Sequence, residues 1–143
     1  MTIESNIAAT RRLIDQGFSN GDLNVCDELV SPGCVEHQRG LRPGIEGTKE
    51  TIRTLHAWFS DFRLVIEDLV ASGDTVWIRN RATGLNTGSI MGRPPTGRSL
   101  EITVFDVLRF EDGKLVEHWG VPDQLGMLVQ LGLFGRPEAA TAA

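Results

Sequence analysis

The stretch LEITVFDVLRFEDGKLVEHWGV, residues 100–121, decides the fold of this chain because it predicts two paired strands. Its first half has the alternating pattern of a strand. The residues of one face are apolar except for a single carboxylate: Ile102, Val104, Asp106 and Leu108. The pair Asp112-Gly113 in the middle is typical of a tight hairpin turn. We therefore expect residues 115–121 to run antiparallel to residues 100–110.

This hairpin is expected to bring His118 close to Asp106 on the cavity face. An Asp beside a His on a half-buried sheet shifts a pKa toward working pH, as general acid–base catalysis requires. A slip of one residue in the register would turn one of the two side chains outward. A histidine in a purely structural hydrogen bond explains the same pattern, and the pattern alone leaves both interpretations open.

The rest of the chain predicts helices first and strands afterwards. Apolar periodicity and capping residues predict a first helix that ends near residue 19 or 20, followed by helices at about 23–30 and 45–59. Strands are expected at 63–71 and 75–86, with a short extended segment at 34–37. A last helix is expected at 122–131, with Asp123 stabilised at its N-terminus by the helix dipole. This order is typical of an α+β fold.

Length and composition predict one soluble domain. The 143 residues are enough for one hydrophobic core, which we expect at residues 1–135, followed by a flexible tail at 136–143. No apolar run approaches the ~20 residues of a membrane span, and the first residues lack the features of a signal peptide, so we expect a cytoplasmic protein without membrane contact. A net charge of −5 argues against nucleic acid as a partner.

The sequence also predicts that no cofactor takes part. Cys26 and Cys34 lie on segments too poor in other ligands to suggest a metal site, so we interpret both as reduced structural residues. No glycine-rich phosphate loop follows a strand. Any chemistry is then expected to rest on side chains, without metal, nucleotide or flavin.

The predicted strand 75–86 has one inward and one outward face. Asn80 lies among apolar residues on the inward face, where an unpartnered amide would cost ~1–3 kcal/mol, so it either bonds to the backbone or contacts a ligand. The outward face carries a tryptophan beside two arginines, which suits a partner better than water: Trp77, Arg79, Arg81 and Thr83. We expect this face to form a homodimer.

Glu36 and His37 are neighbours in an extended segment, so only one of them is expected to point into the core. If Cys34 is buried, Glu36 points inward; the pattern leaves the two directions open. Large aromatic residues such as Trp58 and Trp119 more often pack in a small core than bind substrate, so packing is the first interpretation of both. The loop at 87–98 has the glycines and prolines of a pocket rim or of a plain crossover.

Three further motifs give the chain a family resemblance. With MGRPPTGR at 91–98, FEDGKLVEHW at 110–119 and QLG at 130–132, the chain resembles the SnoaL-like polyketide cyclases of the nuclear-transport-factor-two-like superfamily. The resemblance implies an α+β barrel or cone, in which a strongly curved antiparallel sheet wraps around N-terminal helices and encloses one deep apolar pocket. It also implies a dimer.

The resemblance further implies where catalytic groups should stand. In the cyclases of this family an Asp on the final strand is the acid/base of an intramolecular aldol closure, with a His on the preceding strand and an Asn after the second helix. These positions fall here on Gly120, Asp106 and Glu36, so the usual acid is missing. The superfamily also resembles ketosteroid isomerases, scytalone dehydratase and epoxide hydrolases, which use a carboxylate or a His–Asp pair in the same cone.

Two hypotheses follow. The first is a cofactor-free enzyme that transfers protons at a carbonyl, epoxide or ester of an apolar, oxygenated metabolite, by cyclisation, isomerisation or hydrolysis. Its predicted catalytic residues are Glu36 or Asp106 as the base and His118 as the group that donates or relays the proton. The predicted substrate-binding residues are His37, Asn80, Trp58, Val104 and Gly120. The second hypothesis is a noncatalytic protein that holds a small hydrophobic ligand.

Overall fold

The computed structural model describes residues 2–134. Within this range α1 (Ile3–Arg12) continues into a π-helical segment, η1 (Leu13–Ser19), and is followed by α2 (Asn24–Leu29), β1 (Val30–Glu36) and α3 (Gly44–Trp58). The strands β2 (Phe59–Ser72), β3 (Thr75–Asn86), β4 (Ser99–Glu111) and β5 (Lys114–Pro122) come next, and α4 (Gln124–Gln130) closes the chain. The tail expected at 136–143 lies outside the described residues.

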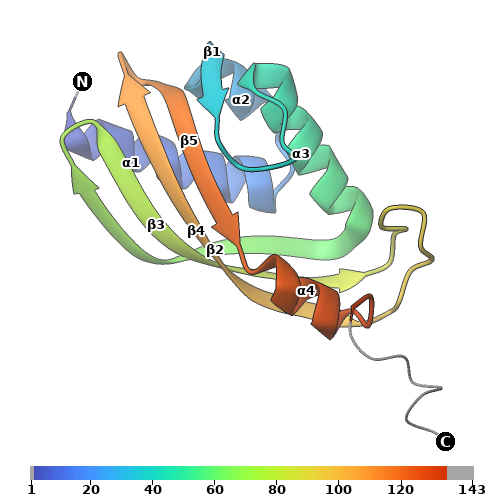
Figure 1. The fold of residues 1–143 in the computed structure, drawn as a ribbon. Helices are drawn as coiled ribbons and strands as arrows, with labels where there is room; N and C mark the ends of the chain where they lie inside the picture. The colour runs from blue at the N-terminus through green and yellow to red at the C-terminus, as the bar shows by residue number, and fades with distance from the viewer. Residues whose placement is uncertain (1, 135–143) are drawn as a thin grey trace, which may run out of the picture.

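The strands form one curved sheet with the order β1-β5-β4-β3-β2. The chain neighbours β2 to β5 pair antiparallel, as the sequence predicts, whereas β1 joins the edge parallel to β5. Figure 1 shows α1, α2 and α3 on one side of the sheet and α4 at the end of β5. The expected α+β cone is confirmed, although the sheet stays open between β1 and β2 instead of closing into a barrel. No helix among the described residues has the length and apolarity to cross a membrane.

Two irregularities bend β2 around the helices. The register against β3 shifts between Ser60 and Arg63, where Asp61 has a φ of 53°, and shifts again between Ile66 and Asp68. An extra residue in one strand bends that strand and increases its twist. The curvature turns one face of the sheet into the wall of a cavity, and buried Phe59, Phe62 and Leu64 of β2 pack on that side.

Three predicted boundaries were wrong by more than one residue. β2 begins at Phe59, four residues before the expected start of this strand at residue 63. The extended segment expected at residues 34–37 begins at Val30, because the run Ser31-Pro32-Gly33, which follows the end of α2 as expected, lies inside β1. The register against β5 is interrupted between Val30 and Val35. An edge strand tolerates a proline at such an interruption. Pro122, expected in the last helix, pairs with Val104 in the sheet instead. Asp123 then caps α4, as its side chain accepts a hydrogen bond from the Gly126 N–H at 2.9 Å.

A bulge in β5 sets the direction of its polar side chains. Arg109 pairs with Glu117 and Phe110 with Leu115, so one extra residue, Val116, lies between these partners. Because side chains alternate along a strand, the extra residue allows both Leu115 and His118 to point inward. Without the bulge, strict alternation from Leu115 would turn Glu117 inward and His118 outward.

The loop between β3 and β4 is held by one buried amide. The Asn86 Nδ2 group donates to the carbonyl oxygens of Trp58 and Gly88, at 2.9 and 3.0 Å, while its Oδ1 accepts from the Thr96 N–H and hydroxyl at 2.8 Å each. The loop therefore rests against the end of α3. It contributes Met91 to the rim of the cavity, which agrees with the pocket-rim interpretation of this segment.

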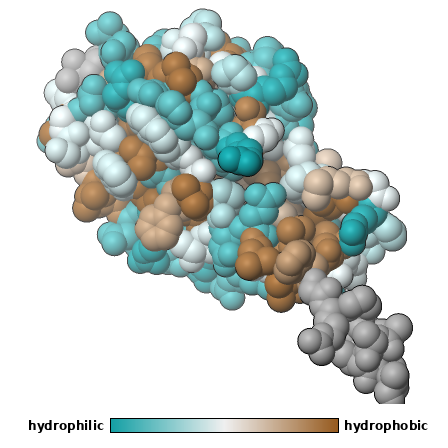
Figure 2. Space-filling view, in the orientation of Figure 1, coloured by the Kyte–Doolittle hydropathy of each residue, from teal (hydrophilic) through white to brown (hydrophobic). Residues whose placement is uncertain are grey.

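The outer face of the sheet carries the side chains from which the sequence predicts a dimer. Trp77 is 55% exposed, and Phe105 and Val121, which pair across β4 and β5, are 53% and 69% exposed. Figure 2 shows apolar side chains gathered over part of the sheet and over α4. Exposed apolar surface is unfavourable in water. A second copy of the chain that covers this surface would remove it from water and so be favoured.

We therefore expect a homodimer that forms through this outer face. Sedimentation at micromolar concentration should give twice the mass of the chain, and Phe105→Glu should give the monomer mass because it places a charge in the apolar contact. A monomer for the unmodified chain at this concentration would contradict the expectation.

Candidate active site

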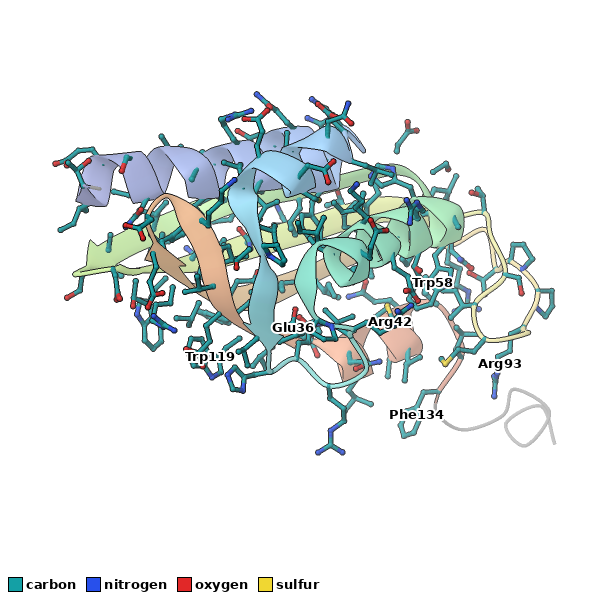
Figure 3. The ribbon with its side chains drawn as sticks, turned by 90° about the horizontal axis from the view of Figure 1, so that it is seen from above. Glu36, Arg42, Trp58, Arg93, Trp119 and Phe134 are labelled. Carbon is teal, nitrogen blue, oxygen red and sulfur yellow. The ribbon has the colours of Figure 1, made fainter. Side chains whose placement is uncertain are left out.

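A cavity of about 460 Å³ lies between the helices and the concave face of the sheet. Its wall is mostly apolar, and side chains from η1, α3, β2 and β4 contribute to it: Leu13, Phe18, Leu55, Phe62, Ile102 and Leu108. Three ionisable side chains, Glu36, Asp106 and His118, also line it. Figure 3 shows Glu36 at the end of β1 and Trp58 at the end of α3. The cavity thus combines a mostly apolar wall with a cluster of three ionisable side chains, while Arg39, Arg42 and Glu50 line it elsewhere.

Asp106 and His118 make the contact that the sequence predicts. His118 Nε2 lies 2.8 Å from Asp106 Oδ1, and both side chains are only 10–16% exposed. The residues are diagonal rather than directly opposite, because Asp106 pairs with Gly120 and His118 with Leu108. The absence of a side chain at Gly120 leaves the diagonal path between them open.

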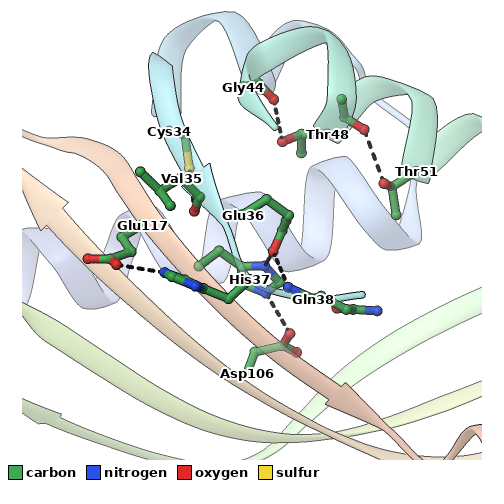
Figure 4. A network of polar contacts seen from close by, with 12 residues as sticks. Cys34, Val35, Glu36, His37, Gln38, Gly44, Thr48, Thr51, Asp106 and Glu117 are labelled. Carbon is green, nitrogen blue, oxygen red and sulfur yellow. Dashed lines mark hydrogen bonds and ion pairs between the residues drawn. The ribbon is translucent and has the colours of Figure 1, made fainter. Parts of the chain in front are cut away.

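Glu36 completes a cluster of three groups. The parallel pairing of β1 with β5 places Glu36 opposite His118, and Glu36 Oε2 lies 2.6 Å from His118 Nδ1. The same oxygen accepts a hydrogen bond from the backbone N–H of Gln38 at 3.1 Å. Glu36 Oε1 makes no hydrogen bond to any residue in the range 2–134, so one carboxylate oxygen of the cluster remains available in the cavity wall. Figure 4 shows Glu36, Gln38 and Asp106 close together, with the polar contacts among the residues drawn as dashed lines.

Asn80 supports the cluster from behind. Its Nδ2 group donates to Asp106 Oδ2 at 2.7 Å, and the residue is 1% exposed and does not line the cavity. The structure thus places Asn80, a predicted substrate-binding residue, behind the cavity wall, where its amide N–H donates to the carboxylate of Asp106. Its Oδ1 is buried without a partner among the described residues, a cost that the contact with Asp106 offsets.

Opposing effects determine the pKa of His118. Burial by itself would lower the pKa of His118, but the hydrogen bonds and negative charges of Asp106 and Glu36 outweigh burial and raise the pKa to about 9. The ring is then an imidazolium at neutral pH, and each of its N–H groups donates to one carboxylate. A positive group between two carboxylates keeps both in place at the cavity wall.

His37, a predicted substrate-binding residue, does not line the cavity and points to the outer side of the sheet. Its Nε2 lies 2.7 Å from Glu117 Oε2, and its ring stacks on Trp119 with a centroid distance of 4.6 Å. Hydrogen bonds from His37 and then from Arg109 lower the pKa of Glu117. Since neighbouring residues of an extended segment point in opposite directions, this outward contact fixes Glu36 on the inside.

Some of the remaining predicted residues lie in the cavity wall, and others lie beside the ionisable cluster. Trp58 and Val104 both line the cavity. Gly120 lies next to the cluster, opposite Asp106, but offers no side chain to the cavity. Cys34 lies in the wall as well, and burial raises the pKa of its thiol to about 11, so it is not a nucleophile at neutral pH.

The structure adds Gln38, Arg39 and Arg42 to the cavity wall, and no pattern in the sequence indicated them. They lie on the connection between β1 and α3, whose position depends on contacts made elsewhere in the chain. In the part of the chain that the structure describes, no group of three or more His, Cys, Asp or Glu side chains is arranged to hold a metal ion.

A pocket of this kind between N-terminal helices and a curved sheet defines a class of small α+β cone proteins. The family model of the SnoaL-like polyketide cyclases matches residues 8–131, and the chain belongs to this family. It is 32% identical to the aklanonic acid methyl ester cyclase DnrD of Streptomyces peucetius over 107 residues. The aligned region covers 73% of this chain and 72% of the relative. Identity to the nogalonic acid methyl ester cyclase of Streptomyces nogalater is 27% over 122 residues, 80% of this chain and 89% of the relative.

Solved structures agree with this assignment. TsrD from Streptomyces laurentii superposes with a TM-score of 0.85 at 28% identity, covering 94% of this chain and 99% of that protein. IdmH from Streptomyces antibioticus superposes with a TM-score of 0.78 at 35% identity, covering 89% and 98%. The resemblance predicted from the motifs is therefore confirmed for both family and fold.

Proposed function

We propose that this chain is an acid–base enzyme that closes a ring in an apolar polyketide ester by moving a proton from a carbon next to a carbonyl group. Relatives named as methyl ester cyclases support the substrate class. The observation that carries the proposal is the cluster of Glu36, His118 and Asp106 in the wall of a mostly apolar cavity. A protein that only held a hydrophobic ligand would have no use for three buried ionisable groups there.

Glu36 is the best candidate for the base. Both oxygens of Asp106 are hydrogen-bonded, to His118 and Asn80, whereas Glu36 Oε1 has no partner among the described residues. A general base must reach the proton that it removes. Asp106 is therefore assigned to hold His118, and His118 to hold the Glu36 carboxylate in position.

The reaction conserves all atoms of the substrate. Glu36 takes a proton from the carbon between the activating carbonyl groups, and the enolate carbon attacks a ketone carbon of the same molecule to form a new C–C bond. The C=O π bond breaks, and the resulting alkoxide takes the proton back from the Glu36 carboxyl. The product is a ring-closed isomer, and no oxidant, reductant or metal enters the balance. The apolar wall excludes water from the enolate.

Incubation with aklanonic acid or nogalonic acid methyl ester tests the function. We expect a ring-closed product of unchanged mass, formed at a rate proportional to protein concentration, with protein that has been dialysed against a chelator and assayed in its presence. Ester that binds in the cavity and is recovered unchanged would favour the noncatalytic ligand-binding function. Activity that the chelator abolishes would contradict the cofactor-free mechanism.

A further inference from the structure

Gly120 leaves a space beside the cluster, and the side chain of Gln38 fills it. A Cβ atom built on Gly120 would lie 2.0 Å from Gln38 Oε1 and 2.9 Å from both Asp106 Oδ1 and His118 Cε1. The backbone φ of Gly120 is not in the left-handed region, so its conformation does not demand glycine. A side chain at this position would require the Gln38 amide, the end of a flexible side chain, to move away, since real Cβ atoms do not lie this near to an oxygen.

The backbone around Gln38 is held from several directions. The His37 N–H donates to the His118 carbonyl oxygen at 2.9 Å, the Gln38 N–H donates to Glu36 Oε2 at 3.1 Å, and the Leu41 N–H donates to the Gln38 carbonyl oxygen at 3.2 Å. On the outer side, His37 is fixed by Glu117. These contacts direct the next side chain, Gln38, toward the cavity and against the cluster.

The side-chain amide of Gln38, by contrast, has no hydrogen-bond partner within residues 2–134. It lines the cavity, and it is a neutral group next to two carboxylates and an imidazolium. The amide carries two N–H donors, and a half turn about its last bond exchanges the positions of oxygen and nitrogen. An ordered backbone with a free amide is what a substrate-binding donor needs, because the backbone needs no ordering when substrate arrives.

We infer that the Gln38 amide donates a hydrogen bond to the substrate carbonyl oxygen that becomes negative when Glu36 removes the proton, and that Gly120 is present to admit this amide. The inference rests on the proposed function and adds the group that stabilises the enolate. A preorganised neutral donor suits this task because it stabilises the new charge without lowering the basicity of the neighbouring carboxylate. Gln38 is thus assigned as a catalytic residue of the same site.

Substitutions at the two positions test the assignment. Gln38→Leu keeps much of the side-chain volume but removes the donor, and we expect kcat for the methyl ester to fall by about 10²-fold while its dissociation constant rises only about three- to tenfold. Gln16→Leu, outside the cavity, is the control and should leave both unchanged. Thermal unfolding of each variant establishes that the fold is intact.

Gly120→Ala provides the second arm because its methyl group would displace the amide. We expect it to lower kcat as Gln38→Leu does, and the double variant to be no slower than either single variant, since both changes remove the same interaction. A kcat within threefold of the unmodified protein in Gln38→Leu would overturn the assignment. So would losses that simply multiply in the double variant.

Failure of the proposed function would look different. An unmodified protein that forms no product contradicts the ring-closing activity, and Gln38 is then judged by binding alone. In that case a change of less than threefold in the dissociation constant of the methyl ester for Gln38→Leu overturns the assignment. A three- to tenfold loss that Gln16→Leu does not share supports it.

Discussion

The Glu36→Gln variant should close the ring of the methyl ester about 10²–10⁴-fold more slowly than the unmodified protein, while it binds the ester almost as well. The loss is expected because a neutral amide does not remove a proton from carbon, and general base catalysis contributes a factor of this size. The variant should fold, since a glutamine oxygen still accepts the hydrogen bonds from His118 Nδ1 and the Gln38 N–H. Single-turnover rates at saturating ester measure the effect.

The control for this variant is Glu67→Gln. Glu67 pairs with Arg81 away from the cavity, so the substitution should change kcat by less than threefold. If Glu36→Gln itself stays within threefold of the unmodified protein, Glu36 is not the base. Asp106 would then take this role, because it is the other carboxylate of the cluster.

Removing the imidazolium should have the second large effect. His118→Ala leaves Glu36 and Asp106 facing each other without a positive group between them, which costs about 3–5 kcal/mol of stability for a buried pair that loses one partner. Turnover is expected to fall by ~10²–10⁴-fold as well, because the base loses its orientation. His118→Gln, which keeps hydrogen-bonding capacity, covers the case in which the alanine variant does not fold.

The pH dependence of stability follows from the same contact. The pKa of His118 rises from an unfolded value of 6.5 to about 9 in the folded chain. A raised pKa gives stability that is fully present below pH 6.5 and is lost as the pH rises through 9. The loss is up to about 3 kcal/mol, since one pKa unit corresponds to 1.36 kcal/mol.

Urea unfolding at pH 6, 8 and 10 gives the free energy of unfolding of the unmodified protein and of His118→Gln. The difference between the two free energies at each pH measures this loss. We expect the unmodified protein to lose stability relative to the variant as the pH increases. If the free energy of unfolding changed with pH in the same way for the two proteins, His118 would not be held as an imidazolium.

Local patterns in the sequence predicted the hairpin and its contact. Alternation along residues 100–110 and the Asp112-Gly113 turn are short-range signals, and they placed Asp106 on the inner face. The contact with His118 depends on more than alternation, because the bulge at Val116 restores the inward direction. Such a bulge is visible in the sequence only as a break in the pattern from Leu115 to His118.

Longer-range pairing explains what the sequence did not predict. The direction of Glu36 and His37 was left open because it depends on the parallel pairing of β1 with β5, some 80 residues later in the chain. Gln38 gave no signal, since a loop residue becomes part of a site only through its approach to Gly120. Asn80 was recognised as an unusual polar core residue, but its partner emerged only from the diagonal contact between β3 and β4.

Chemical rescue of the Glu36→Ala variant tests the central claim most directly. Truncation of Glu36 removes the base and opens space beside the cavity for a small carboxylate such as formate or acetate. If Glu36 is the base, the rate of ring closure should rise in proportion to the added carboxylate and should be higher for the more basic acetate, provided that both fit. A Glu36→Ala variant that folds and binds the methyl ester, yet gains no activity from either anion, would contradict the assignment of Glu36 as the proton acceptor.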